Sequence, residues 1–403
     1  MRIAFPYALL TEYFINANHI NTNKPYQIYS IPARDLLTPE RFDIMAKWIY
    51  IDAREKNLNL ERAVKIYMDN INAFSLGTFT EPGTESKNSF SKYLDDFNLL
   101  IDDIKINGFN ENISLVPVGE DNIILDGSHR TAAAAYYDKN VTVIYFPGMR
   151  RQWDYNFFRQ RLMSDINMGF MASSYTSVKD NLYMACLWPR TGLRLADKVQ
   201  DILLKAGNIL YSQDIYLTFN GIKNFMANIY SHDSWVGTEA NNFAGAAGKA
   251  RACFDKNYPV RTFLFQAHSS ELVLECKQRI RDLYNIEKSS VHISDGQAET
   301  EMMCRILYDP ENLHVINFTQ NYIYGRNYNL PDSSLEKTLP KRYRPSRVQE
   351  RLDYQIQRCR YGQGPLSEMS YCLRHVINPA RKIYNLTRRI KRRLIKLISG
   401  GIK

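Results

Sequence analysis

One stretch of the N-terminal part decides its fold. It reads Ser114-Leu-Val-Pro-Val118, Gly119-Glu-Asp-Asn122, Ile123-Ile-Leu125, Asp126-Gly-Ser-His-Arg130, Thr131-Ala-Ala-Ala-Ala-Tyr-Tyr137 and, after a short turn, Val141-Thr-Val-Ile-Tyr-Phe146. The apolar runs on either side of the first turn predict strands at 114–118 and 123–125. Small residues after Arg130 favour a helix, and the β-branched run at 141–146 predicts another strand. Together these elements predict a mixed α/β fold.

The loop Asp126-Gly-Ser-His-Arg130 has the composition of an anion site at the start of a helix. A helix N-terminus offers unpaired N–H groups and a partial positive charge. Gly127 lets the backbone approach a ligand, Arg130 supplies a fork for phosphate and His129 adds a donor. Asp126 can hold a metal or act as a base. The alternative is a turn in which Arg130 and His129 only cap neighbouring carbonyls.

Upstream of this stretch, apolar spacing predicts three helices. They are expected at 38–58, at 60–74 and from Ser89 or Ser91 to Asn107, while residues 1–30 look irregular. A polar loop, 77–88, separates the second helix from the third.

From about residue 70 to 147, this order of loop, helix, strand, turn, strand, Asp126-Gly-Ser-His-Arg130 loop, helix and strand resembles the ParB/sulfiredoxin-like superfamily. Its members bind nucleotide phosphates with a G-x-x-R loop and the helix that follows. The Asp-Gly-x-His-Arg form is closest to the ParB-like small-molecule kinases. Ser128 stands where sulfiredoxins carry their reactive cysteine, so sulfinic acid repair is not expected. The helix-turn-helix that should follow in a ParB protein is not apparent.

This resemblance implies a kinase that uses ATP or ADP with Mg²⁺. The residues expected to bind the nucleotide phosphates are Gly127, Ser128, His129, Arg130, Thr131, Lys87 and Asn88. Asp126 would orient Mg²⁺ or the transferred phosphoryl group, and Glu81 would be the base for the acceptor hydroxyl, with His129 as a further catalytic candidate. Alternatively, Glu81 lies on a solvated surface loop, and Lys87 and Asn88 only start the next helix.

Strands and helices alternate between residues 186 and 320, which predicts a second α/β domain with a mainly parallel sheet. The expected strands are 215–218, 260–266, 290–294 and 313–318, and the expected helices are 193–206, 222–230, 270–284 and 297–307. His268 and His314 are interpreted as ordinary strand histidines.

Two loops of this domain carry candidate residues. Gly245-Ala-Ala-Gly248-Lys249 opens a helix but is not a P-loop, because Phe243 and Ala250 replace its first Gly and its Ser/Thr. Gly248 and Lys249 there either bind an anion or allow close helix packing. The other candidates are His292, Asp295 and Glu299, at a strand end and helix start. One interpretation is that these three side chains converge to bind a metal or a substrate hydroxyl. The alternative is that Asp295 only caps the helix, with Glu299 in its first turn. Both loops are also similar to a domain from bacterial surface-glycan gene clusters.

The net charge of +10 belongs to the C-terminus. Residues 381–403 carry nine of the 52 bases and no acid, which leaves 43 bases against 42 acids elsewhere. Apolar residues there recur at helical spacing, which predicts a basic amphipathic helix on an anionic membrane. Nucleic acid, an acidic partner and a solvated end are the alternatives. The near-neutral remainder makes DNA an unlikely partner of the folded body.

The chain contains no apolar run long enough for a membrane span and no signal peptide at its start, so a cytoplasmic protein, peripheral on the inner membrane face through its basic end, is expected. The six cysteines show no C-x-x-C and suit reduced thiols. The expected parts are a ParB/sulfiredoxin-like domain (1–148), a helical connector (149–185), a second α/β domain that binds the acceptor (186–320), a basic linker (321–378) and the basic tail (379–403).

The sequence therefore predicts a phosphotransferase, a kinase of a small molecule or sugar in bacterial cell-surface polysaccharide biosynthesis. One alternative is a ParB-like DNA-associated nucleotide switch or nuclease. A second alternative is a non-catalytic nucleotide-sensing scaffold at the membrane.

Overall fold

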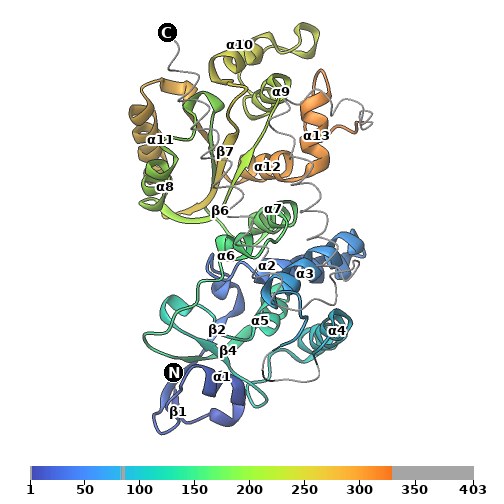
Figure 1. Cartoon of the computed structure of the whole chain (residues 1–403), viewed down its shortest axis with the longest axis vertical. Helices are drawn as coiled ribbons and strands as arrows, with labels where there is room; N and C mark the ends of the chain where they lie inside the picture. The colour runs from blue at the N-terminus through green and yellow to red at the C-terminus, as the bar shows by residue number, and fades with distance from the viewer. Residues whose placement is uncertain (1, 82, 84–86, 329–403) are drawn as a thin grey trace, which may run out of the picture.

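The computed structural model describes residues 2–81, 83 and 87–328. The strands are β1 (Arg2–Ala4), β2 (Tyr26–Pro32), β3 (Val116–Val118), β4 (Asn140–Tyr145), β5 (Leu182–Leu187), β6 (Gly207–Ile215), β7 (Val260–Ala267) and β8 (Val291–Ile293). The α-helices are α1 (Glu12–Ala17), α2 (Ile44–Lys56), α3 (Leu60–Phe74), α4 (Phe90–Asn107), α5 (Ser128–Tyr136), α6 (Tyr155–Gln160), α7 (Asp165–Ser174), α8 (Ala196–Leu204), α9 (Phe219–Ile229), α10 (Ala244–Cys253), α11 (Ser270–Tyr284), α12 (Gln297–Tyr308) and α13 (Pro310–Phe318). The mixed α/β class is therefore confirmed, and the elements form two halves with one sheet each (Figure 1).

The first sheet has the strand order β1-β2-β4-β3. Strand β4 runs antiparallel to β2 and parallel to β3, so this sheet is mixed. Helix α5 lies between β3 and β4 in sequence, and its Ala132–Ala135 run is fully buried against the core. Small side chains let a helix approach a sheet closely, so α5 is held firmly with its first turn at the 126–130 loop.

The second sheet has the order β6-β7-β5-β8, and every neighbouring pair is antiparallel. The prediction of a mainly parallel sheet was wrong. Helix α8 joins β5 to β6 and α11 joins β7 to β8, so each unit connects two parallel strands. These two units interleave, which places an antiparallel strand between the members of each pair. The result is the split β-α-β arrangement of ferredoxin-like folds, with α9 and α10 inserted between β6 and β7.

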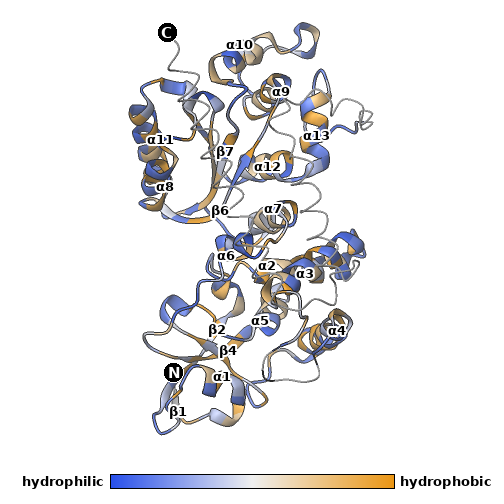
Figure 2. Cartoon of the chain, in the orientation of Figure 1, coloured by the Kyte–Doolittle hydropathy of each residue, from blue (hydrophilic) through white to orange (hydrophobic). Residues whose placement is uncertain are grey.

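Helices cover both faces of the second sheet (Figure 1). Ala185 and Leu187 of β5 pack with α8 and α11, whereas Met184 and Cys186 face the core that includes α9 and α12. This alternation is the period of two expected of a strand whose two faces are both buried. Figure 2 shows the matching pattern in the helices, where α4 and α11 carry both hydrophilic and hydrophobic residues.

Several local predictions fail where tertiary packing decides the structure. Residues 313–318, expected as a strand, belong to α13, so His314 is not a strand histidine. The expected strand 123–125 makes only one bridge, between Ile124 and Val118. Strand β2 lies in a stretch expected to be irregular, and β5 begins within the expected helical connector. Strand β6 begins at Gly207, eight residues before the expected strand 215–218.

Other predictions are confirmed. Helices α3 and α11 span the expected ranges, and Ser89 caps α4 by accepting a hydrogen bond from the Lys92 N–H. The cysteines of the described part, 186, 253, 276 and 304, are free and buried. The predicted basic linker beyond 328 and the tail 379–403 lie outside the described residues.

The two halves share one apolar core. Phe42, just before α2, stacks on Tyr211 of β6 with ring centroids 6.0 Å apart. Asp69 of α3 accepts hydrogen bonds of 2.9 Å from the Ser164 N–H and the Asn167 amide, which fixes the start of α7. Apolar packing and directed polar contacts therefore both join the halves.

Two candidate functional sites

The first site is the start of α5, the 126–130 loop. Gly127 has φ of 86°, a left-handed conformation that side chains rarely adopt. Its N–H donates to Asp126 Oδ1 at 2.7 Å, and its carbonyl accepts from Thr131 Oγ1 at 3.1 Å. The Thr131 side chain is buried and engaged within the helix. Thr131 therefore stabilises the turn. The prediction that Thr131 contacts phosphate does not fit this position, because its side chain is turned into the helix.

The Arg130 guanidinium folds back over Gly127. A Cβ added to Gly127 would meet Arg130 Nη2 at 2.8 Å, so the absence of a side chain at 127 creates this position. Within the described part of the chain, Arg130 donates no hydrogen bond, although Asp126 and Glu81 attract it electrostatically. Burial lowers the pKa of Arg130 from its ordinary value, and these two carboxylates oppose that shift. Arg130 is thus a partly desolvated cation with its donors uncommitted.

His129 lies on the other side of this turn, against aromatic rings. Its Nε2 is 2.8 Å from the Tyr67 hydroxyl, and its ring packs edge-on against Phe97 at 4.8 Å. Burial, followed by the positive charge of Lys47, holds the pKa of His129 well below its usual range. The imidazole is therefore neutral at pH 7. It can offer a hydrogen bond to a phosphate, but not a charge.

The loop before α4 faces this turn, as predicted. Lys87 Nζ is 2.6 Å from Glu81 Oε2, and it also lies 5.4 Å from the Tyr93 ring centre. The Glu81 charge helps raise the pKa of Tyr93, after the larger effect of burial. Glu81, Lys87, Asp126, His129 and Arg130 therefore gather around one turn. Asn88 is exposed just before α4, and its predicted role in phosphate binding stays a prediction.

A buried ionic cluster beneath this turn was missed by the sequence reasoning. Arg41 binds both carboxylate oxygens of Asp43, at 2.9 and 3.0 Å, and Lys47 Nζ is 3.1 Å from Asp43 Oδ2. Burial alone would raise the pKa of Asp43, but the two cations outweigh it and hold that pKa well below its usual range. Arg41 Nη1 also donates to the Ile124 carbonyl at 2.6 Å. This bond fixes the segment that leads into Asp126.

The fit of this site to Mg²⁺ rests on Asp126. Within residues 2–81, 83 and 87–328, no three histidine, cysteine or acidic side chains are grouped closely enough to hold a metal. Mg²⁺ commonly takes only one or two protein carboxylates and completes its shell with substrate phosphates and water. Asp126 uses Oδ1 for the Gly127 N–H, and its other oxygen is the one that fits this role. A Mg²⁺ ion arriving with a nucleotide is therefore compatible with the residues present.

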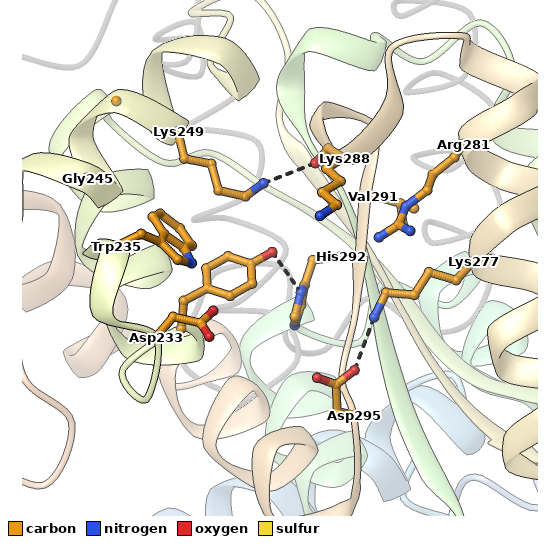
Figure 3. A pocket seen from close by; sticks show the side chains of 12 residues that line it. Asp233, Trp235, Gly245, Lys249, Lys277, Arg281, Lys288, Val291, His292 and Asp295 are labelled. Carbon is orange, nitrogen blue, oxygen red and sulfur yellow. Dashed lines mark hydrogen bonds and ion pairs between the residues drawn. The ribbon is translucent and has the colours of Figure 1, made fainter. Parts of the chain in front are cut away.

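The second site is a cavity of about 510 Å³ at the free edge of strand β8, here called the edge pocket (Figure 3). Helix α10 and the segment after α9 form one wall, and α11 and the η8 turn (Glu287–Ser289) form the other. Its lining residues are Tyr230, Asp233, Trp235, Gly245, Gly248, Lys249, Lys277, Arg281, Lys288, Val291, His292 and Asp295. The separate candidates Gly248, Lys249, His292 and Asp295 thus meet in one cavity.

A buried chain of hydrogen bonds supports this pocket. His292 Nε2 is 3.0 Å from Glu299 Oε1, and its Nδ1 is 3.1 Å from the Tyr230 hydroxyl. Glu299 Oε2 accepts the Asp295 N–H at 2.6 Å. A carboxylate only accepts, so Nε2 carries a proton, and in a neutral imidazole Nδ1 then accepts from Tyr230. Both nitrogens of His292 are therefore engaged, and the predicted convergence of His292 and Glu299 serves to fix Tyr230.

The sequence reasoning missed six polar or aromatic lining residues: Tyr230, Asp233, Trp235, Lys277, Arg281 and Lys288. Lys277 and Arg281 are four residues apart on a correctly predicted helix, so they share a face. That spacing is a signal, but it does not say that the face meets α10. The close-packing alternative holds for Gly245, where a Cβ would meet the Trp235 carbonyl oxygen at 1.7 Å, but not for Gly248, which has open space where a Cβ would point.

Compared with protein-family models, with curated proteins and with solved structures, the chain matches none. The resemblance to the ParB/sulfiredoxin-like superfamily stays a prediction from the motif. In the part of the chain that the structure describes, no helix is both long and apolar enough to cross a membrane.

Proposed function

We propose that the chain is a phosphotransferase that uses ATP or ADP to phosphorylate a small molecule or a sugar. The observation that carries this proposal is Arg130, a partly desolvated cation with no hydrogen-bond partner in the described part, held over Gly127 at the start of α5. A helix start with a free guanidinium suits phosphate oxygens. Its acceptor would belong to cell-surface polysaccharide synthesis if the similarity of the second domain holds.

Each residue of the loop would have a separate task. The Ser128 N–H group and Arg130 would hold phosphate oxygens, and neutral His129 would add one hydrogen bond. The Gly127 N–H would join them only after leaving Asp126 Oδ1. Asp126 would hold Mg²⁺, which supplies charge neutralisation to the phosphates when bound. Glu81 would accept the proton of the acceptor hydroxyl. For that step Lys87 must leave Glu81, and a phosphate oxygen is the natural alternative partner for Lys87.

A non-catalytic nucleotide sensor is the second candidate, and the Glu81–Lys87 pair favours it. At 2.6 Å, Lys87 occupies the carboxylate that a kinase would need as its base. A sensor predicts nucleotide binding without turnover in the presence of any acceptor, whereas a kinase predicts acceptor-dependent loss of ATP or ADP.

Isothermal titration tests the proposal. ATP, ADP, CTP and GTP with Mg²⁺ would be titrated at fixed salt into the wild type and into Arg130→Ala. Loss of one charged phosphate contact should weaken ATP or ADP binding roughly ten- to a hundred-fold. Arg279→Met, which changes an exposed arginine of α11, is the matched control and should bind like the wild type.

The other outcomes separate the alternatives. Preference for CTP would favour the ParB-like nucleotide switch. Failure of the folded wild type to bind any of the four nucleotides would leave the 126–130 loop as a structural turn and refute the proposal.

A further inference from the structure

The edge pocket has a surplus of positive charge. Lys277 pairs with Asp295 at 3.1 Å and also donates to the Ile293 carbonyl, which covers the edge of β8. Lys249 donates to the Lys288 carbonyl at 3.3 Å and lies over the Tyr230 ring, 5.4 Å from its centre. Across residues 2–81, 83 and 87–328, no carboxylate lies within ion-pair distance of Lys249, Arg281 or Lys288. These three cations therefore line one cavity without an ion pair to any carboxylate of the described residues, although Asp233 also lines the cavity.

This arrangement is costly without a ligand. The Arg281 Nε is buried and has no hydrogen-bond partner in the described structure. Burial lowers the pKa of Lys249, and the charges of Lys288 and Arg281 lower it further. A buried donor without a partner costs about 1–3 kcal/mol. An anion among the three side chains would satisfy the donor and remove the repulsion.

The opposite wall is aromatic and acidic. Trp235 is 44% exposed and packs against the Tyr230 ring at 5.3 Å. Figure 3 shows Trp235 and Asp233 on the side away from Arg281 and Lys277, with His292 between the two walls. An exposed indole offers a flat apolar surface to a ring, and the exposed Asp233 carboxylate can accept hydrogen bonds from hydroxyl groups. The cavity therefore offers an aromatic and acidic surface at Trp235 and Asp233, with Lys249 on the same wall and Arg281 and Lys288 on the other.

We propose that the edge pocket is a second ligand site, which binds a small molecule carrying phosphate or pyrophosphate on a hydroxylated ring. The phosphate contacts Lys249, Arg281 and Lys288. The ring lies against Trp235 with its hydroxyls toward Asp233. A volume of about 510 Å³ is within the range of small-molecule sites.

Tyr230 is a positioning residue in this site. Its hydroxyl donates a hydrogen bond to His292 Nδ1, so the lone pairs of its oxygen are available to accept a hydrogen bond from a ligand hydroxyl. Burial raises the pKa of Tyr230, with Glu299 adding to the effect, so the hydroxyl stays protonated. Glu299 and His292 thereby fix the direction of this hydrogen bond.

The edge pocket is separate from the 126–130 loop. It lies against the second sheet, whereas α5 belongs with the first sheet in the other half of the molecule (Figure 1). The proposal stands whether or not the loop binds a nucleotide, and each site has its own arginine to test.

The test is titration of the full chain with inorganic pyrophosphate, ribose 5-phosphate and AMP at low, fixed salt. Arg281→Met and Lys249→Met should each weaken binding of all three probes by roughly tenfold or more. Trp235→Ala should weaken ribose 5-phosphate and AMP but spare pyrophosphate. Arg279→Met, on the same helix as Arg281, should leave binding of pyrophosphate and ribose 5-phosphate unchanged. Circular dichroism and the melting temperature check that each variant is folded.

Three results would overturn the proposal. The first is no binding of any probe to the folded wild type. The second is equal binding by the wild type and the folded Arg281→Met and Lys249→Met variants. The third is pyrophosphate binding that is lost in Arg130→Ala, which would place the anion at the 126–130 loop. Equal loss of all probes in Trp235→Ala would overturn the assignment of the ring to Trp235.

Discussion

The two candidate sites treat their charges in opposite ways. Around the 126–130 loop, Lys87 pairs with Glu81 and Lys47 with Asp43, and Arg130 stays without a hydrogen bond in the described part. At the edge pocket most of the lining cations have no carboxylate of the protein close to them. The first site therefore offers one directed contact on a rigid turn. The second offers a concentrated positive field, which salt should weaken more strongly.

This difference separates two roles of charged side chains, support of the fold and binding of a ligand. Buried paired charges support the fold, and their removal should cost stability. Unpaired charges await a ligand, and their removal should cost binding but little stability. Mutations ranked by their effect on the ligand-free protein test this distinction.

The largest effect is expected from Arg41→Met. Arg41 and Asp43 are 2% and 1% exposed, so the substitution leaves a buried carboxylate with only Lys47 as its cation. Breaking such a pair typically costs about 3–5 kcal/mol of the free energy of unfolding, measurable by chemical denaturation. Arg279→Met, from an exposed pair, should cost less than about 1 kcal/mol. Equal losses in the two variants would contradict a structural role for the cluster.

The next effect is expected from Tyr230→Phe. This substitution keeps the ring but removes the hydroxyl that donates to His292 Nδ1. His292 is only 3% exposed, so water cannot readily replace that donor. A buried polar atom left unpaired costs about 1–3 kcal/mol. Tyr258→Phe, at an exposed ring with no side-chain hydrogen bond in the described structure, is the control for loss of a hydroxyl. A change in Tyr230→Phe no larger than in this control would show that the hydrogen-bond chain is not formed.

A smaller effect concerns pH and His129. Burial lowers its pKa in the folded protein, so the unfolded chain binds a proton more readily below the ordinary value near 6.5. The stabilisation is complete above pH 6.5 and is lost as pH falls through that value toward the depressed one. His129→Gln should therefore lose less stability than the wild type between pH 7 and 5.5. Parallel denaturation curves at both pH values would mean that His129 titrates normally.

The smallest effect is expected from Lys288→Met in the ligand-free protein. Because Lys288 repels Lys249, its removal should change the free energy of unfolding by no more than about 0.5 kcal/mol, or stabilise slightly. The same variant should bind pyrophosphate more weakly and with less dependence on salt. A large loss of stability would mean that Lys288 has a structural partner and is not part of a surplus.

Apolar spacing and residue propensity predicted those helices whose structure depends mainly on their own sequence. Helix α11 follows the apolar spacing of Val273, Cys276 and Ile280, and α5 follows its alanine run. The direction of the second sheet was not predictable in the same way. Alternating strands and helices are compatible with adjacent parallel strands or with interleaved units, and only long-range pairing chooses between them.

The sites show the same limit. Glu81 and Lys87 were predicted by resemblance to face the 126–130 loop, and in the structure they pair with each other and act electrostatically on Arg130 and His129. The convergence of Lys249 with His292 was not predicted, because it depends on which helix covers the edge of β8. The Arg41–Asp43–Lys47 cluster was missed because a charge run at a helix start usually faces solvent.

Hydrogen–deuterium exchange with and without ATP and Mg²⁺ is the most direct test of the central claim, that the 126–130 loop binds nucleotide phosphates. The account predicts slower exchange of the amides of residues 127–130 and of the loop that holds Glu81 and Lys87, and no such slowing in Arg130→Ala. Unchanged exchange at residues 127–130 at saturating nucleotide, or slowing confined to α10 and α11 at the edge pocket, would contradict it.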